Sequence, residues 1–378
     1  MKPNAKITWS TIVLALLFVS GQTSAQTVYT GDLIQGRQVI SQLDVGDLEA
    51  GRKHQFFFQG VQMGTGQYWY LPVIVAKGAQ PGKRIVLTSG VHGDELSPVD
   101  AVQRVMAQLD PASMSGTVLA VYDISRPAME STQRSWPTGN MLIDLNREWP
   151  GNEEGNRITV RHAGLVFNRL IAPNADYVID NHTAGTGGDF TAFIFAKMSE
   201  PEIRAMAELF PIEQIKNDPG YQGTLETALV EAGIPALTTE LGGPRSFDRR
   251  IIPMFVEGML NVLKHHGVIE GPMGRTATDT GTFIGNAFSS LRATRGGFIE
   301  LLVELGEQVA PEQIVAIQRN SFGDVVAEYR SKVSGQVSWL RRDAMLEPGG
   351  KLMDVLYYDP DPACEPDGCP QDPADYLE

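Results

Sequence analysis

The sequence predicts an α/β protein followed by a second, all-β domain. In residues 81–268, short apolar runs alternate with segments of helical pattern. Such alternation is typical of strands and helices that build a largely parallel sheet with helices on its faces. After Gly267 the alternation stops, and residues 269–356 hold short β-like runs broken by glycine. A chain of 378 residues is long enough for two or three domains.

Each element of the α/β unit is predicted from the length of an apolar run and from the residues that bound it. Short runs between turn residues predict strands, and longer amphipathic segments predict helices. The expected strands span residues 84–89, 116–122, 175–181, 191–196 and 236–239. The expected helices span residues 96–109, 153–171, 224–232 and 249–265. Ahead of them, residues 26–80 form a β-rich lead-in that ends at the break Gln80-Pro-Gly-Lys83.

Residues 1–25 have the pattern of a secretory signal peptide. Lys2 and Lys6 supply the positive start, residues 12–19 form an apolar run, and residues 23–25 offer small side chains for cleavage. The apolar run is shorter than the roughly 20 residues that span a bilayer. We therefore expect an exported protein, periplasmic or secreted, without stable membrane insertion after cleavage. A retained anchor is the alternative.

The other end of the chain, residues 357–378, is an acidic, proline-rich tail. From Leu352 onward the sequence holds eight acidic residues and no basic residue. Cys364 and Cys369 flank a Pro-Asp-Gly segment that favours a turn. Because export leads to an oxidising compartment, we expect a disulfide between these cysteines. A two-thiol metal site is the alternative.

The charge balance excludes one class of partner. The chain carries 31 Lys and Arg against 45 Asp and Glu, a formal net charge of −14. Nucleic-acid binding needs a basic face that neutralises phosphates, so we expect no nucleic-acid partner. Since eight of the acidic residues lie near the end of the chain, the overall charge says little about a substrate.

Two predicted strand ends carry side chains that suit a metal ion. The strand 84–89 is followed by Gly-Val-His92-Gly-Asp-Glu95, and the strand 175–181 closes on His182. The carboxyl ends of parallel strands meet at one edge of the sheet, where open α/β sheets place their sites. Two histidines and one carboxylate with an open fourth position are typical of catalytic zinc sites. We therefore expect one Zn²⁺ per chain.

A third strand end offers a proton carrier. Glu240 follows the predicted strand 236–239 and precedes two glycines that allow close approach. A carboxylate there could take a proton from water and pass it to a leaving amine. Both motifs have plain structural alternatives: Asp94 or Glu95 could cap the next helix, and Glu240 could be a solvated acid at a strand end.

Arginines and one asparagine are the candidate contacts to a substrate. Asn146 and Arg147 lie side by side in the segment Asp144-Leu-Asn-Arg-Glu-Trp-Pro-Gly151, and a guanidinium can hold a carboxylate through two hydrogen bonds. Upstream, Arg126 and Arg134 are candidates to stabilise a developing oxyanion. We therefore expect a small-molecule carboxylate as the substrate.

Together these motifs resemble those of the succinylglutamate desuccinylase/aspartoacylase family, a branch of the zinc carboxypeptidase-like hydrolases. They stand in the family's order: the Gly-x-His-Gly-Asp-Glu type motif, Asp-Leu-Asn-Arg, a strand that ends in His-Thr, and the Thr-Glu-x-Gly type motif. The resemblance covers roughly residues 81–268. It implies a three-layer core around a mixed, largely parallel sheet, with a smaller β domain after it. The longer Asp-Leu-Asn-Arg-Glu-Trp-Pro-Gly form is similar to the branch of predicted deacylases.

The resemblance also implies a role for each motif residue. It implies that zinc is held by His92, Glu95 and His182, and that Glu240 is the general acid and base. It implies that the Asn-Arg pair holds the substrate carboxylate. The arginine that faces the oxyanion is matched best by Arg134, which has one extra residue in its context, and Arg126 is the fallback.

Two features limit what the resemblance implies. The segment Gly243-Pro-Arg245 after the base departs from the aspartoacylase pattern, so the identity of the substrate is not carried over. The β domain resembles a biotinyl/lipoyl-like sandwich around residues 332–337 and 349–354, but it has no convincing motif for a carrier lysine. We expect it to serve as a lid or wall over the site.

The expected function is zinc-dependent hydrolysis of the amide bond of an N-acyl amino acid or a similar small carboxylate. One alternative is a zinc carboxypeptidase that acts on exported or cell-wall peptides. Another is a non-catalytic zinc- or ligand-binding protein. A deep pocket closed by the β domain favours a small substrate, whereas an open groove favours peptides.

Overall fold

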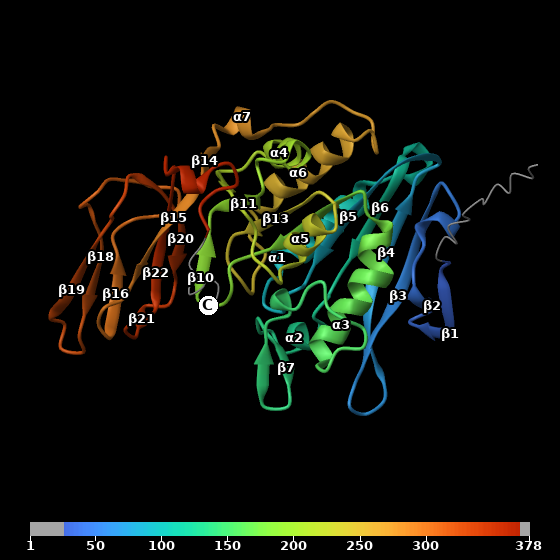
Figure 1. Ribbon diagram of the computed structural model, residues 1–378, viewed down its shortest axis with the longest axis horizontal. Helices are drawn as coiled ribbons and strands as arrows, with labels where there is room; N and C mark the ends of the chain where they lie inside the picture. Colours follow the sequence, from blue (N-terminus) through green and yellow to red (C-terminus); the bar gives the residue numbers. More distant parts are fainter. Residues whose placement is uncertain (1–25, 371–378) are drawn as a thin grey trace, which may run out of the picture.

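The computed structural model describes residues 26–370, which form two folded units (Figure 1). The first unit is built on an 11-stranded sheet, and the second, orange to red in Figure 1, on two smaller sheets. The predicted α/β class with a second β unit is therefore confirmed. The predicted signal peptide, residues 1–25, and the end of the acidic tail, residues 371–378, lie outside the described residues.

The large sheet is mixed and mostly parallel. Its strand order is β1-β2-β3-β4-β6-β5-β9-β13-β11-β12-β14. The pairs from β6 through β5 and β9 to β13 are all parallel, whereas β4 and β11 join this group in antiparallel fashion. The strands are β1 (Val28–Ile34), β2 (Arg37–Gln42), β3 (Arg52–Gln62), β4 (Tyr68–Lys77), β5 (Gln80–Ser89), β6 (Ser115–Val121), β9 (Tyr177–His182), β11 (Ala192–Ala196), β12 (Gln214–Asn217), β13 (Ala236–Leu241) and β14 (Phe283–Gly285).

Helices cover both faces of this sheet and bury its centre. One face packs against α1 (Ser97–Gln108), α4 (Pro201–Glu208) and α6 (Ile252–His265). The other face packs against α3 (Ile158–Val166), which continues as a π-helical turn over Phe167–Ile171, and against α5 (Leu225–Glu231). Strand β9 lies between these layers and is buried along its whole length. Burial on both faces is expected for a central parallel strand; in β9 the first three residues are apolar and the last three are buried polar residues.

Two sequence-based predictions in this unit are wrong in detail. The predicted break at residues 80–83 lies inside β5, where the pairing with β6 shifts register between Gln80 and Arg84. A bulge of this kind lets proline and glycine remain in a strand. The helix predicted from residue 153 begins only at Ile158, because Asn152 organises the preceding residues as a turn: its backbone oxygen accepts from Gly155 N and its side chain from Glu154 N.

The second unit consists of two small antiparallel sheets that enclose a core of their own. One sheet has the order β10-β20-β22-β15, with β17 paired to β20, and the other has the order β19-β18-β16-β21. The strands are β10 (Gly188–Phe190), β15 (Ala287–Arg292), β16 (Gly297–Leu301), β17 (Gln308–Val309), β18 (Ile314–Arg319), β19 (Val325–Arg330), β20 (Gly335–Arg341), β21 (Met345–Leu346) and β22 (Lys351–Tyr357). Shorter elements elsewhere are α2 (Arg126–Glu130), the hairpin β7 (Trp136–Thr138) and β8 (Met141–Ile143), and α7 (Ala277–Thr280).

The two units exchange strands at their boundary. Strand β14 lies beyond residue 269, where the β domain was predicted to begin, yet it pairs with β12 in the large sheet. Conversely, β10 belongs by sequence to the α/β unit but pairs with β20 of the second unit, and it lies between the two units in Figure 1. Residues 26–80, predicted as a lead-in, supply β1 to β4 of the large sheet.

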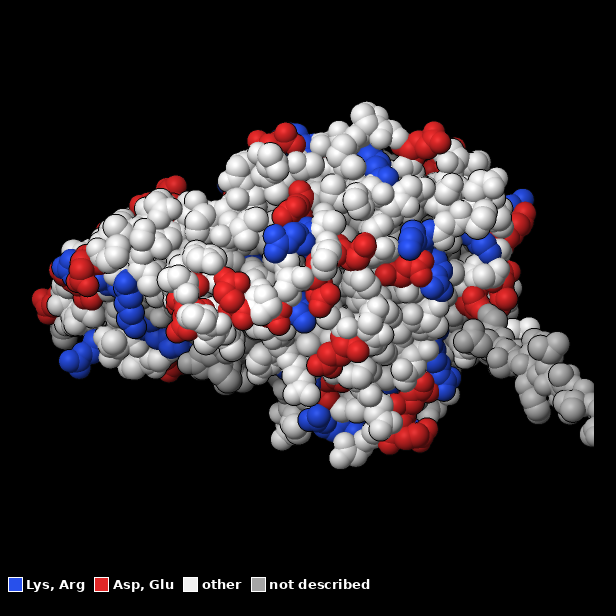
Figure 2. Space-filling model, turned by 45° about the horizontal axis from the view of Figure 1, so that its top comes forward, with Lys and Arg blue, Asp and Glu red and all other residues white. Residues whose placement is uncertain are grey.

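The described part of the tail is held against the folded body. Cys364 and Cys369 form a disulfide. Asn217 donates a side-chain hydrogen bond to the backbone oxygen of Pro366, and Cys369 N donates to the backbone oxygen of Asn286. Acidic and basic side chains are interspersed on the face seen in Figure 2. Among residues 26–370, no helix has both the length and the apolar character required to cross a membrane.

The packing of α6 predicts one large stability effect. Phe210 is fully buried, its ring lies 5.9 Å from that of Phe255, and it contacts Gly258, where an added Cβ would come within 2.0 Å of the ring. We expect Phe210→Ala to lower the free energy of unfolding by about 3–5 kcal/mol, because it leaves a cavity that the helix cannot fill. Urea denaturation measures the change. The matched control Phe322→Ala removes a ring that is 91% exposed and should change stability by less than about 0.5 kcal/mol; equal effects would contradict this account of the core.

Candidate metal centre and active site

The candidate site lies where three neighbouring parallel strands end. Strands β5, β9 and β13 are adjacent in the large sheet and run in the same direction. The loop after β5 carries His92 and Glu95, β9 ends at His182, and β13 carries Glu240 as its penultimate residue. In the parallel register, Glu240 pairs with His182. The sheet therefore brings together four residues that are up to 148 positions apart in the chain.

The loop after β5 is shaped by close backbone packing. An added Cβ at Gly93 would lie 2.0 Å from the backbone carbon of Ala128 in α2, so only glycine fits between the two segments. Helix α1 begins at Ser97, and its N-terminus has no side-chain cap among the described residues. The structure therefore contradicts the alternative in which Asp94 or Glu95 caps this helix. Glu95 instead turns toward the two histidines.

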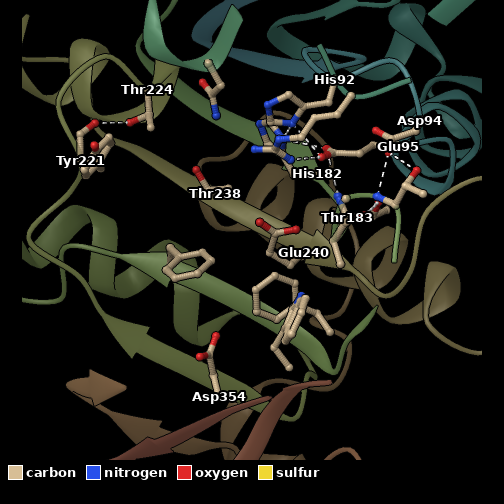
Figure 3. A pocket seen from close by; sticks show the side chains of 18 of the residues that line it. His92, Asp94, Glu95, His182, Thr183, Tyr221, Thr224, Thr238, Glu240 and Asp354 are labelled. Atoms are coloured by element: carbon tan, nitrogen blue, oxygen red, sulfur yellow. Dashed lines mark hydrogen bonds and ion pairs between the residues drawn. The ribbon is translucent and has the colours of Figure 1, made fainter. Parts of the chain in front are cut away.

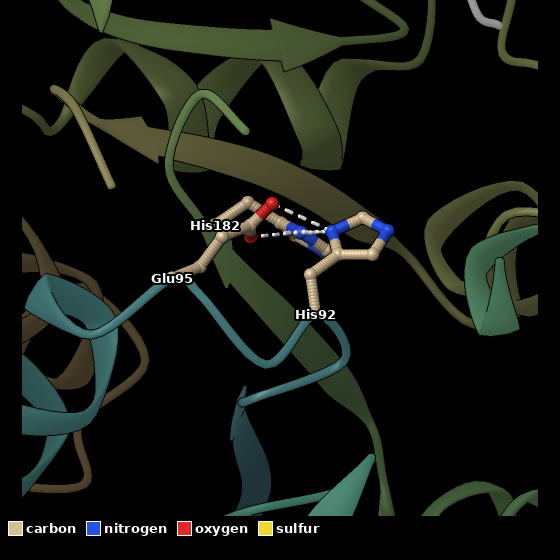
Figure 4. Close-up of side chains that lie close together, drawn as sticks. All are labelled: His92, Glu95 and His182. Atoms are coloured by element: carbon tan, nitrogen blue, oxygen red, sulfur yellow. Dashed lines mark hydrogen bonds and ion pairs between the residues drawn. The ribbon is translucent and has the colours of Figure 1, made fainter. Parts of the chain in front are cut away.

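His92, Glu95 and His182 point at a common centre (Figure 4). His92 Nδ1 lies 2.7 Å from Glu95 Oε1, and His182 Nδ1 lies 2.8 Å from Glu95 Oε2. The two Nδ1 atoms are 3.2 Å apart. All three side chains are buried. Burial alone would raise the pKa of Glu95, but the neighbouring His92 and His182 overcome that effect and hold this pKa below its usual range, so the carboxylate is ionised.

Each histidine is oriented by a second carboxylate. His92 Nε2 lies 2.9 Å from Asp144 Oδ1, and His182 Nε2 lies 2.9 Å from Asp180 Oδ2. Metal-binding histidines usually bond through the second ring nitrogen to a carboxylate or carbonyl, which fixes the ring and its tautomer. The sequence-based search missed both acids. Asp180 was detectable, because it precedes His182 by two residues and therefore lies on the same face of β9.

The donor set fits a zinc ion. Imidazole nitrogen and carboxylate oxygen bind Zn²⁺ at about 2.0–2.2 Å, which places ligand atoms around a tetrahedral ion about 3.3 Å apart. The 3.2 Å between the two Nδ1 atoms matches that spacing. Three protein ligands would leave a fourth position open toward the pocket, as in catalytic zinc sites. The three side chains and the carboxylates that orient them therefore suit Zn²⁺, the metal that the sequence predicts.

Glu240 faces the pocket beside this centre (Figure 3). Its Oε2 atom is buried and has no hydrogen-bond partner among the described residues. Burial, followed by the negative charge of Glu95, raises the pKa of Glu240 to about 8. An unpaired carboxyl group with such a pKa is suited to accepting and returning a proton near neutral pH. The alternative in which Glu240 is only a solvated acid at a strand end therefore does not describe its surroundings.

Of the two arginines that are candidates to stabilise the oxyanion, Arg134 lies at the pocket and Arg126 does not. Arg134 lines the pocket, where its Nη1 lies 3.1 Å from Glu95 Oε1 and its Nη2 lies 3.3 Å from Asp144 Oδ2. Arg126 lies in α2, pairs with Glu130, and is absent from the described residues that line the pocket. The structure therefore does not bring the fallback arginine to the site.

Asn146 and Arg147 also line the pocket. They lie in a short 3-10 turn, Leu145–Arg147, whose start is capped by the Asp144 carboxylate. Asn146 Oδ1 accepts a hydrogen bond from Leu225 N, and the guanidinium of Arg147 lies over the ring of Tyr221, 5.0 Å from its centroid. These contacts hold both side chains at the rim of the site, on the same side as the candidate ligands.

The pocket is a cavity of about 310 Å³ that the two units enclose together. Sequence analysis missed many of the other residues that line the pocket, because they come from segments with no catalytic motif. These residues are Phe190, Phe195, Asp218, Tyr221, Glu226, Phe288, Trp339, Arg341, Lys351 and Asp354. Asp354 lies at the end of the pocket remote from His92 in Figure 3.

Comparisons with known proteins identify a matching family. A family model described as the Succinylglutamate desuccinylase/Aspartoacylase catalytic domain matches residues 81–266. The chain is 28% identical over 295 residues to N-alpha-acetyl-L-2,4-diaminobutyric acid deacetylase of Halomonas elongata, a match that covers 75% of this chain and 84% of that enzyme. It is 23% identical over 180 residues to succinylglutamate desuccinylase of Vibrio parahaemolyticus, covering 47% of this chain and 52% of that enzyme.

Solved structures show the same fold. The product-bound ectoine utilization protein EutE (DoeB) of Ruegeria pomeroyi superimposes with a TM-score of 0.73 at 24% identity, covering 82% of this chain and 96% of that one. A succinylglutamate desuccinylase/aspartoacylase of Rhodobacter sphaeroides gives a TM-score of 0.70 at 25% identity, covering 83% and 98%. The curated relatives remove acyl groups from amino acids. Through residues 81–266, the chain belongs to the succinylglutamate desuccinylase/aspartoacylase family.

Proposed function

We propose that this protein is a zinc-dependent hydrolase that cleaves the amide bond of an N-acyl amino acid or a similar small carboxylate. The observation that carries the proposal is the facing pair of histidine Nδ1 atoms beside Glu95, each ring backed by a carboxylate. Glu240, whose buried Oε2 atom has no hydrogen-bond partner among residues 26–370, lies next to this set. The family's deacylating relatives support the same reaction class.

Each residue of the site has a separate role in the proposed reaction. What zinc supplies, when bound, is polarisation of the scissile carbonyl and a water whose pKa falls toward about 7. Glu240 takes a proton from the attacking water and returns it to the leaving amine nitrogen. Arg134 stabilises the negative charge that develops on the carbonyl oxygen. Asn146 and Arg147 orient the substrate through its carboxylate.

The shape of the pocket supports a small substrate. Its volume of about 310 Å³ lies at the lower end of the range for small-molecule sites. Trp339 and Asp354 of the second unit form the far wall, where a peptide substrate would need an open groove. A carboxypeptidase and a purely binding protein are the competing functions, and a turnover assay separates them.

Two substitutions test the central assignment. Purified wild-type protein with zinc should hydrolyse members of a panel of N-acyl amino acids faster than short peptides. Glu240→Gln should reduce kcat by at least about 10²-fold, because it removes the proton acceptor, and should retain stoichiometric zinc. His92→Ala should lose both activity and zinc. Liberated amine and metal content are the measurements; full activity in Glu240→Gln would overturn the mechanism, and preferred turnover of peptides would favour the carboxypeptidase.

The two arginines provide a matched comparison. We expect Arg134→Ala to lower kcat about 10²–10³-fold, since it removes a preorganised donor from the developing oxyanion. Arg126→Ala should leave kcat within about twofold, because this side chain pairs with Glu130 outside the pocket. Steady-state kinetics on the best substrate of the panel measures both. A larger loss in the Arg126 variant than in the Arg134 variant would reverse this assignment.

The carboxylate behind His182 should tune metal affinity. Asp180 is fully buried and bonds both His182 Nε2 and the hydroxyl of Thr88. We expect Asp180→Asn to weaken zinc binding about 10–100-fold, because the carboxylate that orients the His182 ring is lost. Competition with a chelator measures the Kd. The control Asp324→Asn alters an exposed acid in the turn before β19 and should leave the Kd unchanged; equal Kd values for both variants would contradict the role given to Asp180.

A further inference from the structure

The end of the pocket remote from the histidines has a different chemical character. It is lined by four aromatic side chains, Phe190, Phe195, Phe288 and Trp339, which we call the aromatic compartment. Phe190 lies in β10, the strand shared by the two units, Phe195 lies in β11 of the large sheet, and Phe288 and Trp339 lie in β15 and β20 of the second unit. None of these residues is used by the reaction described above. The pairing of β10 with β20 brings Phe190 and Trp339 together.

The rings of the compartment are held in place by one another. The ring of Phe195 lies 6.0 Å from that of Phe190 and 6.0 Å from that of Phe288, in edge-to-face arrangements. Behind them, the fully buried Phe193 lies 4.8 Å from Phe195 and 5.8 Å from Phe288. Aromatic pairs at these separations and angles attract one another. The apolar surface is therefore a preformed wall that needs no rearrangement to accept a ligand.

Trp339 closes the compartment from the second unit. It pairs with Phe190 across β10 and β20, and its ring lies against Gly188, where an added Cβ would come within 2.5 Å of the ring. The cationic groups of Arg341 and Lys351 lie 5.1 Å and 4.8 Å from the centre of the Trp339 ring. The missing side chain at Gly188 and these two cations fix the position of the indole.

The two lysines near the compartment are paired within the protein. Lys351 Nζ lies 2.6 Å from Asp354 Oδ2. Lys216, which is fully buried and 5.6 Å from the centre of the Phe288 ring, pairs with Asp218. A charged substrate group placed against these rings would lose its hydration, whereas an apolar group would gain the free energy of leaving water.

We infer that the aromatic compartment binds an apolar group of the substrate, so that the preferred substrates are N-acyl amino acids with an aromatic or branched aliphatic group. The inference rests on the proposed function and names its substrate class. In Figure 3, Glu240 lies between His92 and Asp354. With the carboxylate at Asn146 and Arg147 and the scissile carbonyl beside Arg134, the remainder of the substrate therefore extends past Glu240 toward Asp354. The apolar group belongs either to the amine half or to the acyl half of the substrate.

A panel of substrates tests the inference and distinguishes an apolar group on the amine half from one on the acyl half. We expect zinc-loaded wild-type protein to show kcat/KM at least about 10-fold higher for N-acetyl-L-phenylalanine or N-benzoylglycine than for N-acetyl-L-aspartate, N-succinyl-L-glutamate and N-acetyl-2,4-diaminobutyrate. A preference for the first compound places the apolar group on the amine half, and a preference for the second places it on the acyl half. A preference for any polar or charged compound overturns the inference but leaves the proposed function intact. Hydrolysis of none of them overturns both.

Variants of the wall supply the second readout. Phe288→Ala should lower the ratio of kcat/KM for the better aromatic substrate to that for N-acetylglycine at least about 10-fold, mainly through KM, because binding surface is lost. Phe288→Leu, which keeps an apolar side chain and guards against misfolding, should lower the ratio less. The control Phe298→Ala removes a phenyl ring from β16, 47% exposed and outside the pocket, and should leave the ratio unchanged. An unchanged ratio in both Phe288 variants would overturn the inference.

Discussion

The site depends on the parallel alignment of three neighbouring strands. Because β5, β9 and β13 run in the same direction, residues that follow or end them meet at one edge of the sheet. The backbone pairing of Glu240 with His182 places the proposed proton carrier beside a candidate metal ligand. The short loop after β5 brings His92 and Glu95 to the same place. Helices that bury both faces of the sheet keep this alignment rigid.

Electrostatic coupling then gives each ionisable group a separate task. Glu95 stays ionised between two imidazoles, while Glu240, buried and close to that negative charge, keeps its proton more readily. Arg134 contacts both Glu95 and Asp144, so it ties the metal ligands to the carboxylate that orients His92. Pairs of titratable groups whose surroundings push their pKa values apart are the usual basis of acid–base division in enzymes.

Residues placed directly after a strand were predictable, because strand ends can be recognised from an apolar run and its boundary. That is why His92, Glu95, His182 and Glu240 could be named from the sequence, together with the α/β class. The aromatic compartment could not be, since its rings come from β10, β11, β15 and β20, and their proximity arises from pairing between distant segments. Likewise, the choice of Arg134 over Arg126 depends on the path of the chain after α2, which no local pattern encodes.

The strand shared between the two units constrains how a ligand reaches the centre. Besides the pairing of β10 with β20, Arg342 N donates to the backbone oxygen of Gly187, and the Arg342 side chain pairs with Asp189. Swinging the second unit away would break these backbone hydrogen bonds together with the packing of Trp339. The shape of the far wall is therefore tied to the pairing of β10 with β20, because opening it would require these hydrogen bonds to break.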